Sequence, residues 1–278
     1  MSKPRRLPPR PLQVVRSTLL NPKLVRITLG TKPGGTELNE FPEDSRGDHI
    51  KLMFPRAHQT VPKLPTLGPD GPVWPAADER PITRTYSVSQ FRAEQGELDV
   101  DFVLHSEGPG SLWAESAKPG DAVGLAGPGG PKRVKPGADW YLLVADPSSY
   151  AAFAAALDSL PPHATGYALI EVGAANEEIE TPHPPGIELR WLVREQGRAG
   201  ESRLLIDAVQ ELAWLRGTPS VMVSGENAQV IAIRNYVVRE HKVPKAMIYA
   251  VPYWKDLHDE ERYHQERHRI MDEMDEAE

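Results

Sequence analysis

The sequence contains no cysteine. This absence excludes disulfide bridges, zinc sites with cysteine ligands and iron–sulfur clusters held by cysteine. Any electron transfer by this protein therefore requires a bound organic cofactor, or a metal held by other ligands.

Long apolar segments are absent as well. The basic, proline-rich start MSKPRRLPPRPL is followed by no apolar core of a signal peptide, so we expect no secretory signal. The longest apolar stretches, such as YAAFAAAL, are much shorter than a membrane-spanning helix of roughly 20 residues. With 40% hydrophobic and 26% charged residues, the composition is typical of soluble globular proteins. We expect a cytoplasmic protein without membrane insertion.

The main part of the chain has no excess charge of either sign. The formal net charge is −7, but residues 256–278 contain ten acidic residues and three arginines, which account for all of it. Residues 1–255 are therefore neutral overall. A neutral body gives no general attraction to nucleic acid, so we expect no nucleic-acid partner.

Several short motifs typical of nucleotide binding or nucleophilic catalysis are missing. The sequence has no GxGxxG, no phosphate-binding loop of the Walker A type and no GxSxG nucleophile elbow. Near the C-terminus, His264 and His268 in HQERH would share one face of a helix and could bind a metal. Because the glutamate is misplaced for the zinc-protease motif, we interpret HQERH as solvated helix surface and expect no metal site.

The first half of the chain has the pattern of a β-barrel. Short alternating or β-branched strands are expected at LVRITLG, HIKLMF, TRTYSVSQF, ELDVDFVLH and DAVGLAG, with Gly/Pro-rich connections between them. Strands without intervening helices indicate a closed antiparallel barrel, which we assign to residues 1–135. Residues 61–81 are too proline-rich for a regular element and predict a long surface loop.

The second half alternates strands and helices. Apolar strands are expected at YLLVAD, YALIEV, LRWLVR, SVMVSG and AMIYAV, with helices at 148–160, 201–215 and 226–241. This order predicts an α/β domain with a parallel sheet over residues 136–255. The acidic residues 256–278 predict a C-terminal helix with a thin apolar stripe: Leu257, Tyr263, Ile270 and Met274.

One group of residues suits a nucleotide cofactor. In RTYS, Arg84 offers a fork of donors for a phosphate, Tyr86 a flat ring and Ser87 a hydroxyl. Alternation along a strand puts Arg84 and Tyr86 on one face and Ser87 on the other. Downstream, His105 is followed by the turn GPGSLW, whose helix start can hold a pyrophosphate with unpaired backbone N–H groups.

These segments resemble one family over nearly the whole chain. DHIKLMFP (48–55), RTYS (84–87), DVDFVLH (99–105), GPGSLW (108–113), PGDAVGLAGPGG (119–130), SGE (224–226) and YWK (253–255) are similar to segments of the siderophore-interacting flavoproteins. That family is a branch of the ferredoxin-reductase-like superfamily. The resemblance implies an N-terminal barrel that binds FAD and a C-terminal α/β domain that can receive NADH or NADPH.

The same resemblance implies roles for individual residues. Arg84 would face the FAD phosphates, Tyr86 would pack beside the flavin ring and ribityl chain, and Ser87 would hydrogen-bond near flavin N5. The remaining implied contacts, on the diphosphate and adenosine side, are His105, Gly108, Gly110, Ser111, Leu112 and Trp113.

The implied reaction is reduction of an Fe(III)–siderophore to Fe(II), which the siderophore binds more weakly. Flavin suits this task because it accepts two electrons as a hydride and can pass them on singly. Ferric catecholates are strongly anionic, and Lys51 and Lys255 fall on family positions tied to their pocket; Arg133 is a third candidate. For each of the three, the alternative is a solvated surface cation. We expect a monomer.

The chain departs from the family at the first strand of the α/β domain. A segment like GDETALPA is usual there, whereas this chain has ADPSSYAAF at 145–153, which keeps Asp146 and adds the bulk of Tyr150. The change puts the usual use of nicotinamide in doubt and leaves reduced ferredoxin as another donor. Arg194 and Arg198 could contact a nucleotide phosphate, and Glu226 could lie near the cleft or begin a helix.

Two other functions stay open at this point. A general NAD(P)H–flavin oxidoreductase would keep the flavin and use another acceptor. A non-enzymatic siderophore- or nucleotide-binding protein would keep the fold without the reaction.

Overall fold

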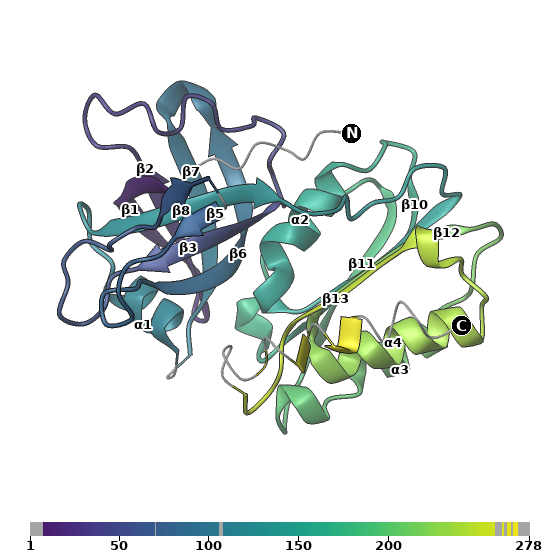
Figure 1. Cartoon of the computed structure of the whole chain (residues 1–278). Helices are drawn as coiled ribbons and strands as arrows, with labels where there is room; N and C mark the ends of the chain where they lie inside the picture. The colour runs from purple at the N-terminus through teal and green to yellow at the C-terminus, as the bar shows by residue number, and fades with distance from the viewer. Residues whose placement is uncertain are drawn as a thin grey trace. The chain divides into compact units, whose positions relative to one another are not determined.

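The computed structural model describes residues 8–69, 71–105, 108–258, 263, 266–267 and 269–271. The chain divides into two compact units, Met1–Gly130 and Pro131–Glu278 (Figure 1). The expected boundary near Lys135 lies five residues beyond the observed one. Among the described residues, no helix has both the length and the apolar character needed to cross a membrane.

The first unit is a closed barrel of six strands. The strands follow one another around the barrel in the order β1-β2-β7-β6-β3-β8, and every neighbouring pair is antiparallel, which confirms the predicted antiparallel barrel. Their bounds are β1 (Arg10–Asn21), β2 (Leu24–Gly30), β3 (His49–Phe54), β6 (Ile82–Arg92), β7 (Glu97–Val103) and β8 (Ala122–Gly129).

Alternation along the strands fills the barrel interior. On β3, Ile50, Leu52 and Phe54 point inward and are buried, and β7 and β8 contribute inward residues in the same way. The buried apolar core includes Ile27, Leu29, Val88, Leu98, Val100, Phe102, Val123 and Leu125. Because the sheet closes on itself, burying these side chains leaves no unpaired sheet edge in the barrel.

Three strands of this unit were missed by the sequence reasoning: β1, and the two short strands β4 and β5 that lie within a predicted loop. Strand β1 closes the barrel by pairing with both β2 and β8, although residues 16–19 are exposed. Its second half is held by ladder hydrogen bonds and shows no clear apolar alternation. Within the expected loop 61–81, β4 (Thr66–Gly68) and β5 (Gly71–Val73) form a short antiparallel hairpin. Such short paired segments leave little pattern in a proline-rich sequence.

One helix belongs to the barrel unit. Helix α1 (Pro109–Ser116) follows β7, starts with Pro109 at its first position and packs Trp113 and Ala114 against the barrel core. Proline is tolerated there because the first helical N–H has no intrahelical acceptor.

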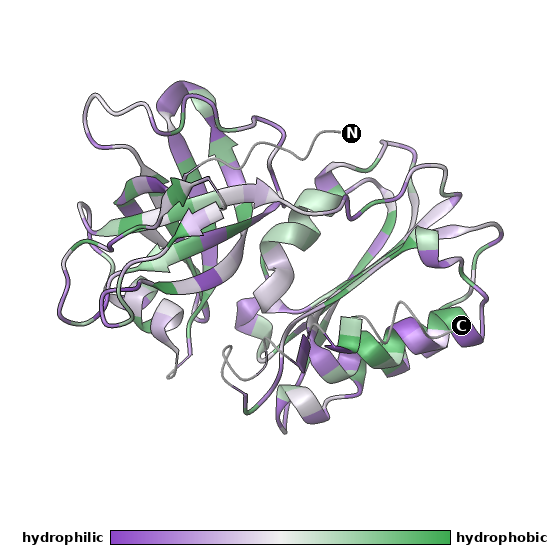
Figure 2. Ribbon diagram, in the orientation of Figure 1, coloured by the Kyte–Doolittle hydropathy of each residue, from purple (hydrophilic) through white to green (hydrophobic). Residues whose placement is uncertain are grey.

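The second unit is a five-stranded parallel sheet with helices. The strand order is β11-β10-β9-β12-β13, and all four pairs are parallel, as predicted. The helices are shorter than expected. In Figure 2, α2 is pale green along most of its length, the colour of hydrophobic residues, in keeping with its almost complete burial. The bounds are β9 (Trp140–Ala145), α2 (Tyr150–Asp158), β10 (Thr165–Val172), β11 (Gly186–Val193), α3 (Leu204–Glu211), β12 (Pro219–Glu226), α4 (Asn227–Arg239) and β13 (Ile248–Trp254).

The strand order of this sheet contains a switch point. From β9 the chain proceeds outward to β10 and β11, then returns to the other side of β9 for β12 and β13. The carboxyl ends of β9 and β12 are therefore neighbours. In open α/β sheets, ligands bind at the crevice formed by such strand ends.

The C-terminal segment differs from the predicted continuous helix. Asp256 and Leu257 form a turn, and Leu257 has φ 63° and a 73% exposed side chain, so it does not contribute to a buried apolar stripe. Tyr263 and residues 266–267 and 269–271 are helical. His264 and His268 lie outside the described residues, as does Met274. Within the described part of the chain, no cluster of three metal-ligating side chains occurs.

Candidate functional site

The two faces of β6 carry different residues of RTYS. The pairing of β6 with β3 sets Arg84 opposite Leu52 and Tyr86 opposite Ile50, so both side chains lie on the inward face, as expected. Ser87 lies opposite His49, and Thr85 opposite Lys51, on the outward face. Arg84 donates from Nη1 to the Thr83 carbonyl at 2.9 Å. The residues of RTYS therefore lie alternately on the inward and the outward face of one strand.

Tyr86 belongs to an aromatic cluster under helix α1. Its ring centroid lies 4.4 Å from that of Phe102, and Trp113 lies 4.9 Å from Phe54. The Tyr86 hydroxyl comes so close to Gly110 that a Cβ there would stand 2.0 Å from Oη. Glycine at position 110 is therefore what allows α1 to approach the tyrosine. The structure brings together three of the predicted residues: Tyr86, Gly110 and Trp113.

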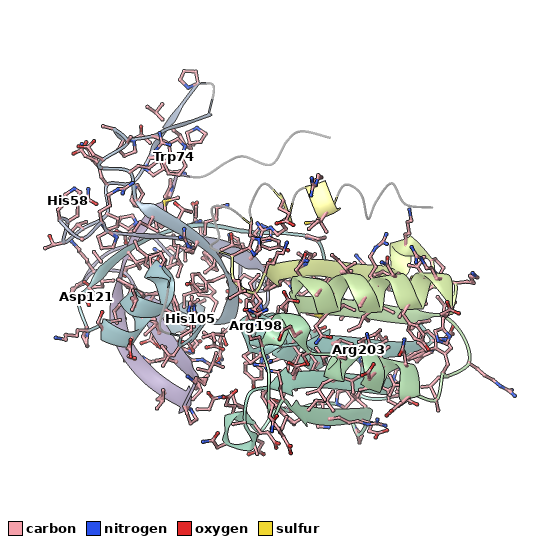
Figure 3. All side chains as sticks on the ribbon, turned by 90° about the horizontal axis from the view of Figure 1, so that it is seen from below. His58, Trp74, His105, Asp121, Arg198 and Arg203 are labelled. Carbon is pink, nitrogen blue, oxygen red and sulfur yellow. The ribbon has the colours of Figure 1, made fainter. Side chains whose placement is uncertain are left out.

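A second group of predicted residues fixes the start of α1. The Ser111 hydroxyl accepts from the His105 backbone N–H and donates to the His105 carbonyl, both at 2.8 Å. Gly108 has φ 94°, and a Cβ on it would lie 2.9 Å from Cε1 of His105, which is labelled in Figure 3. Leu112 is 51% exposed. The first-turn N–H groups lack intrahelical acceptors and can donate to a phosphate.

Ser87 is buried without a hydrogen-bond partner. Its side chain is 9% exposed, and its hydroxyl finds no partner among the described residues. The neighbouring outward positions on β8 are the small residues Ala126 and Gly129, which pair with Lys51 and His49. An unpaired buried hydroxyl is costly unless a ligand completes its hydrogen bond. These residues, together with the helix start, fit a flavin nucleotide.

The predicted cations lie in different surroundings. Lys51 is exposed on the outward face of β3, on the same face as Ser87. Lys255, just after β13, is partly exposed, and its Nζ lies 2.6 Å from Glu266 Oε1. Arg133 is 7% exposed and holds its guanidinium 5.7 Å from the centroid of the Tyr249 ring, so it is not a solvated surface cation. Lys51 belongs to the barrel unit, and the other two belong to the α/β unit.

Asp146 occupies the switch point of the parallel sheet. Its carboxylate accepts from Ser148 N (2.9 Å) and Ser148 Oγ (2.5 Å), from Glu226 N (2.8 Å) and from Trp254 Nε1 (2.7 Å). Gly225, with φ 139°, allows this approach, because a Cβ there would lie 2.7 Å from the carboxylate. Burial raises the pKa of Asp146, and the hydrogen bonds from Ser148 and Trp254 oppose that rise.

Glu226 caps the helix that follows β12. Its Oε2 accepts from Ala228 N at 2.5 Å and its Oε1 from Asp256 N at 3.2 Å, so of the two expectations for this residue the helix start is confirmed. Asp146 and Ser149 form a capping box before α2. The 3-10 turn Pro147–Ser149 that leads into α2 and the start of α4 are therefore both capped by side chains of this chain.

The two arginines predicted to contact a phosphate form ion pairs. Arg194 pairs with Glu171, which also accepts from Ser202 Oγ at 2.7 Å. Burial raises the pKa of Glu171 against the opposing effects of Ser202 and Arg194. Arg198, half-exposed and labelled in Figure 3, pairs with Glu201 at 2.7 Å and with Asp256 at 3.4 Å. Their predicted contact with a nucleotide stays a prediction.

Tyr150, which was expected to add bulk to the turn after β9, is buried in its own unit. It is 7% exposed, and its hydroxyl lies 3.0 Å from Thr181 Oγ1. Its bulk therefore packs inside the α/β unit. Of the other residues in this segment, Ser148 donates from its backbone N–H and its hydroxyl to Asp146.

Comparison with known proteins identifies the family. Residues 13–132 match the model of the siderophore-interacting FAD-binding domain, and residues 138–257 match the model of the siderophore-interacting protein. The chain belongs to the siderophore-interacting protein family. Ferric vibriobactin reductase ViuB of Vibrio cholerae is 40% identical over 271 residues, which cover 96% of this chain and 97% of that protein.

Further relatives and solved structures are similar to this chain in sequence or in fold. The NADPH-dependent ferric-chelate reductase of Escherichia coli is 31% identical, covering 77% of this chain and 83% of that protein. The siderophore-interacting protein SipS from Aeromonas hydrophila has a TM-score of 0.82 at 33% identity, covering 95% and 98% of the two chains. The ferredoxin reductase in carbazole 1,9a-dioxygenase, at 14% identity, has a TM-score of 0.60 over 87% of this chain and 68% of that chain, which confirms the ferredoxin-reductase-like fold.

Sequence reasoning missed part of this family member's site. It noted Asp146 and the YWK segment separately, but not the 2.7 Å hydrogen bond that joins Asp146 to Trp254. It also missed Glu171 and Glu266. A signal for Glu171 was present, since an acidic residue inside the apolar strand YALIEV is expected only where a partner meets it.

Proposed function

We propose that this protein is an FAD-dependent reductase that converts the Fe(III) of a bound ferric siderophore to Fe(II), so that the iron is released. FAD takes up two electrons as a hydride and delivers them one at a time, which matches a two-electron donor to ferric iron. The names of the relatives from Vibrio cholerae and Escherichia coli support ferric chelates as substrates.

One observation carries this proposal. The register of β3 and β6 places Lys51 and the unpaired hydroxyl of Ser87 on the same outward face of the barrel, on neighbouring residue pairs. Ser87 and Lys51 are diagonal neighbours on that face, and such neighbours in an antiparallel pair lie roughly 7–8 Å apart, within reach of a long side chain. A flavin ring that takes a hydrogen bond from Ser87 would therefore have a cation close beside it, where an anionic chelate can bind.

The other barrel residues would hold the nucleotide. The backbone N–H groups of Gly110 and Ser111, at the start of α1, would donate to the phosphates together with Arg84. Gly108 and the Ser111–His105 hydrogen bonds would keep that helix start in place, and Tyr86 and Trp113 would pack on apolar parts of the cofactor, with the exposed Leu112 on the adenosine side.

Lys51, Lys255 and Arg133 would bind the chelate. Coulomb attraction acts on charged chelates only, so Lys51→Ala combined with Lys255→Ala should weaken binding of a trianionic ferric tricatecholate by about tenfold or more, and that of a neutral ferric trihydroxamate very little. Titration of the protein with each chelate, followed by tryptophan fluorescence, measures the two dissociation constants. Lys118→Ala with Lys245→Ala, two exposed lysines elsewhere, is the matched control. Equal losses for both chelates would show that the lysines do not contact the substrate.

Two kinds of electron donor are candidates, a nicotinamide nucleotide and reduced ferredoxin. NADPH is supported by the name of the Escherichia coli relative. Reduced ferredoxin is a second candidate, favoured by the carboxylate caps of Asp146, on the turn that leads into α2, and of Glu226, on the start of α4, because a pyrophosphate would bind near these positions. Such donors are held inside the cell, so we place the reaction in the cytoplasm. We propose that the protein acts as a monomer.

The first test is the visible absorption spectrum of the purified protein, with release and identification of any chromophore. We expect FAD. Anaerobic mixing with NADH, NADPH or reduced ferredoxin should then bleach the flavin, and a ferric tricatecholate should restore its colour. A colourless protein that takes up no added FAD would contradict the proposal and favour a non-enzymatic binding protein. Faster reoxidation by quinones or dyes than by the chelate would favour a general flavin oxidoreductase.

A further inference from the structure

The proposed chelate ligand Lys255 already has an anionic partner within the chain. Its Nζ lies 2.6 Å from Glu266 Oε1, and both side chains are a little over one quarter exposed, at 27% and 28%. The second oxygen of Glu266 lies 3.9 Å from Nε2 of His258. The lysine is thus neutralised, but its ammonium group is still accessible to a solute anion.

The backbone on both sides of Lys255 is fixed. Trp254 donates from Nε1 to Asp146 at 2.7 Å, and the backbone N–H of Asp256 donates to Glu226 Oε1 at 3.2 Å. Each of these carboxylates is buried and belongs to the switch point of the sheet. Lys255 therefore cannot leave Glu266 by a shift of the main chain without breaking these bonds, and the pair must separate by side-chain rotation.

Glu266 is also held on the α/β unit by a neighbour. The Tyr263 side chain is 2% exposed, and its hydroxyl donates to Oδ1 of Asn227, the first residue of α4, at 2.9 Å. A buried aromatic side chain anchors the segment by apolar contact as well as by this hydrogen bond. The carboxylate of Glu266 therefore stays at a high effective concentration near Lys255.

We propose that Glu266 is a specificity-determining residue that competes with the chelate for Lys255. This inference rests on the proposed function. An incoming anion must replace the carboxylate, and attraction to the ammonium group grows with the charge of the anion. A trianionic chelate can displace Glu266, whereas a solute with one carboxylate gains no more than Glu266 already supplies. The internal pair therefore selects highly charged ferric chelates and rejects simple carboxylates.

The test compares Glu266→Gln with Glu188→Gln. Glu188 is an exposed carboxylate that pairs with Arg190 on the edge strand β11, so both variants remove one negative charge from the same unit. Glu266→Gln should tighten binding of a trianionic ferric tricatecholate about two- to fivefold, the range of an exposed ion pair. It should leave a neutral ferric trihydroxamate unchanged and make acetate a measurable competitor. Glu188→Gln should change none of these.

Lys255→Ala separates this inference from the proposed function. In the Lys255→Ala background, Glu266→Gln should have no effect on tricatecholate binding, which supports the competition. If Lys255→Ala weakens the tricatecholate but Glu266→Gln alone changes nothing, the competition is overturned and the proposed function stands. If Lys255→Ala has no effect either, Lys255 is not a substrate contact, and both its proposed role and this inference are overturned.

Discussion

In the barrel, the buried hydroxyl of Ser87 has no partner among the described residues, whereas in the α/β unit the buried carboxylate of Asp146 accepts four hydrogen bonds from Ser148, Glu226 and Trp254. Both residues lie where their unit would meet a ligand: on the outward face beside Lys51, and at the switch point of the parallel sheet. An unpaired buried group is costly to the fold, so it indicates an external partner. A fully paired one indicates an internal support.

The pKa values of buried or partly buried carboxylates shift in opposite directions in the two units. Hydrogen bonds from Arg16 lower the pKa of Glu97 in the barrel. For Asp99, burial would raise the pKa, but Arg92 and Thr28 outweigh it and the net shift is downward. In the α/β unit, burial dominates and raises the pKa of Asp146 and of Glu171. In the barrel the hydrogen bonds to these acids, mainly from arginines, outweigh burial, whereas in the α/β unit burial outweighs the neutral donors around Asp146 and the Arg194 pair of Glu171.

Removal of the Asp146 carboxylate should have the largest effect. Asp146→Ala leaves Glu226 N and Trp254 Nε1 without an acceptor inside the unit, and we expect a loss of about 3 kcal/mol in the free energy of unfolding. Urea unfolding, followed by tryptophan fluorescence, measures it. Asp207→Ala, an exposed partner of Arg203 on α3, is the control and should cost less than about 0.5 kcal/mol. Similar losses for the two variants would contradict the role of Asp146 as the internal support of the switch point.

A fall in pH should remove the stabilising effect of these carboxylates from the barrel and increase it in the α/β unit. A lowered pKa gives Glu97 and Asp99 a stabilising effect that is present above their unfolded values of 4.5 and 3.8 and lost as the pH falls through the lower folded values. The raised pKa values of Asp146 and Glu171 have the reverse effect: their stabilisation is full below 3.8 and 4.5 and is lost as the pH rises through the folded values.

Between pH 5 and 3 the barrel should therefore open first. Pepsin digestion at stepwise lower pH, with mass-spectrometric location of the cuts, should find the first sites within residues 8–130. Thermolysin at pH 7 gives the baseline susceptibility of each unit. First cuts within residues 131–258 would show that these carboxylates do not decide the acid response.

The smallest expected change in stability is that of Ser87→Ala, which we compare with Ser89→Ala on the same strand. Ser87→Ala removes an unpaired hydroxyl, so the free energy of unfolding should change by less than about 0.5 kcal/mol, while flavin reduction should slow about tenfold for one lost hydrogen bond. Ser89, which accepts from Arg26 and donates to Asp101, is the matched control. Ser89→Ala should cost about 1 kcal/mol and leave the flavin unchanged. Stopped-flow reduction and urea unfolding separate the two; a reversed pattern would refute the assignment of Ser87.

The barrel strands β2, β3, β6, β7 and β8 and all five strands of the parallel sheet were predictable, because alternating or continuous apolar runs mark each of them. Strand β1 and the β4–β5 hairpin were not, since β1 is half exposed and the hairpin strands are three residues long. At the site, RTYS, GPGSLW, Lys51 and Lys255 were found as motifs. The Asp146–Trp254 bond and the Lys255–Glu266 pair were not: the first joins residues 108 positions apart, and the second, 11 positions apart, joins a residue just after β13 to one in the C-terminal segment.

By itself, the sequence determined most of the strands and helices and the division into barrel and α/β unit, because these depend on local periodicity and composition. The residues for a flavin and an anionic chelate were found through the resemblance of its motifs to a family. Only the tertiary structure decided which polar groups are paired. Ser87, on the outward face, has no hydrogen-bond partner in the part of the chain that the structure describes, Asp146 accepts from residues of β12 and β13, and Lys255 is neutralised by Glu266. The physical reason is that hydrogen bonds and ion pairs depend on distances across the fold, which no local pattern specifies.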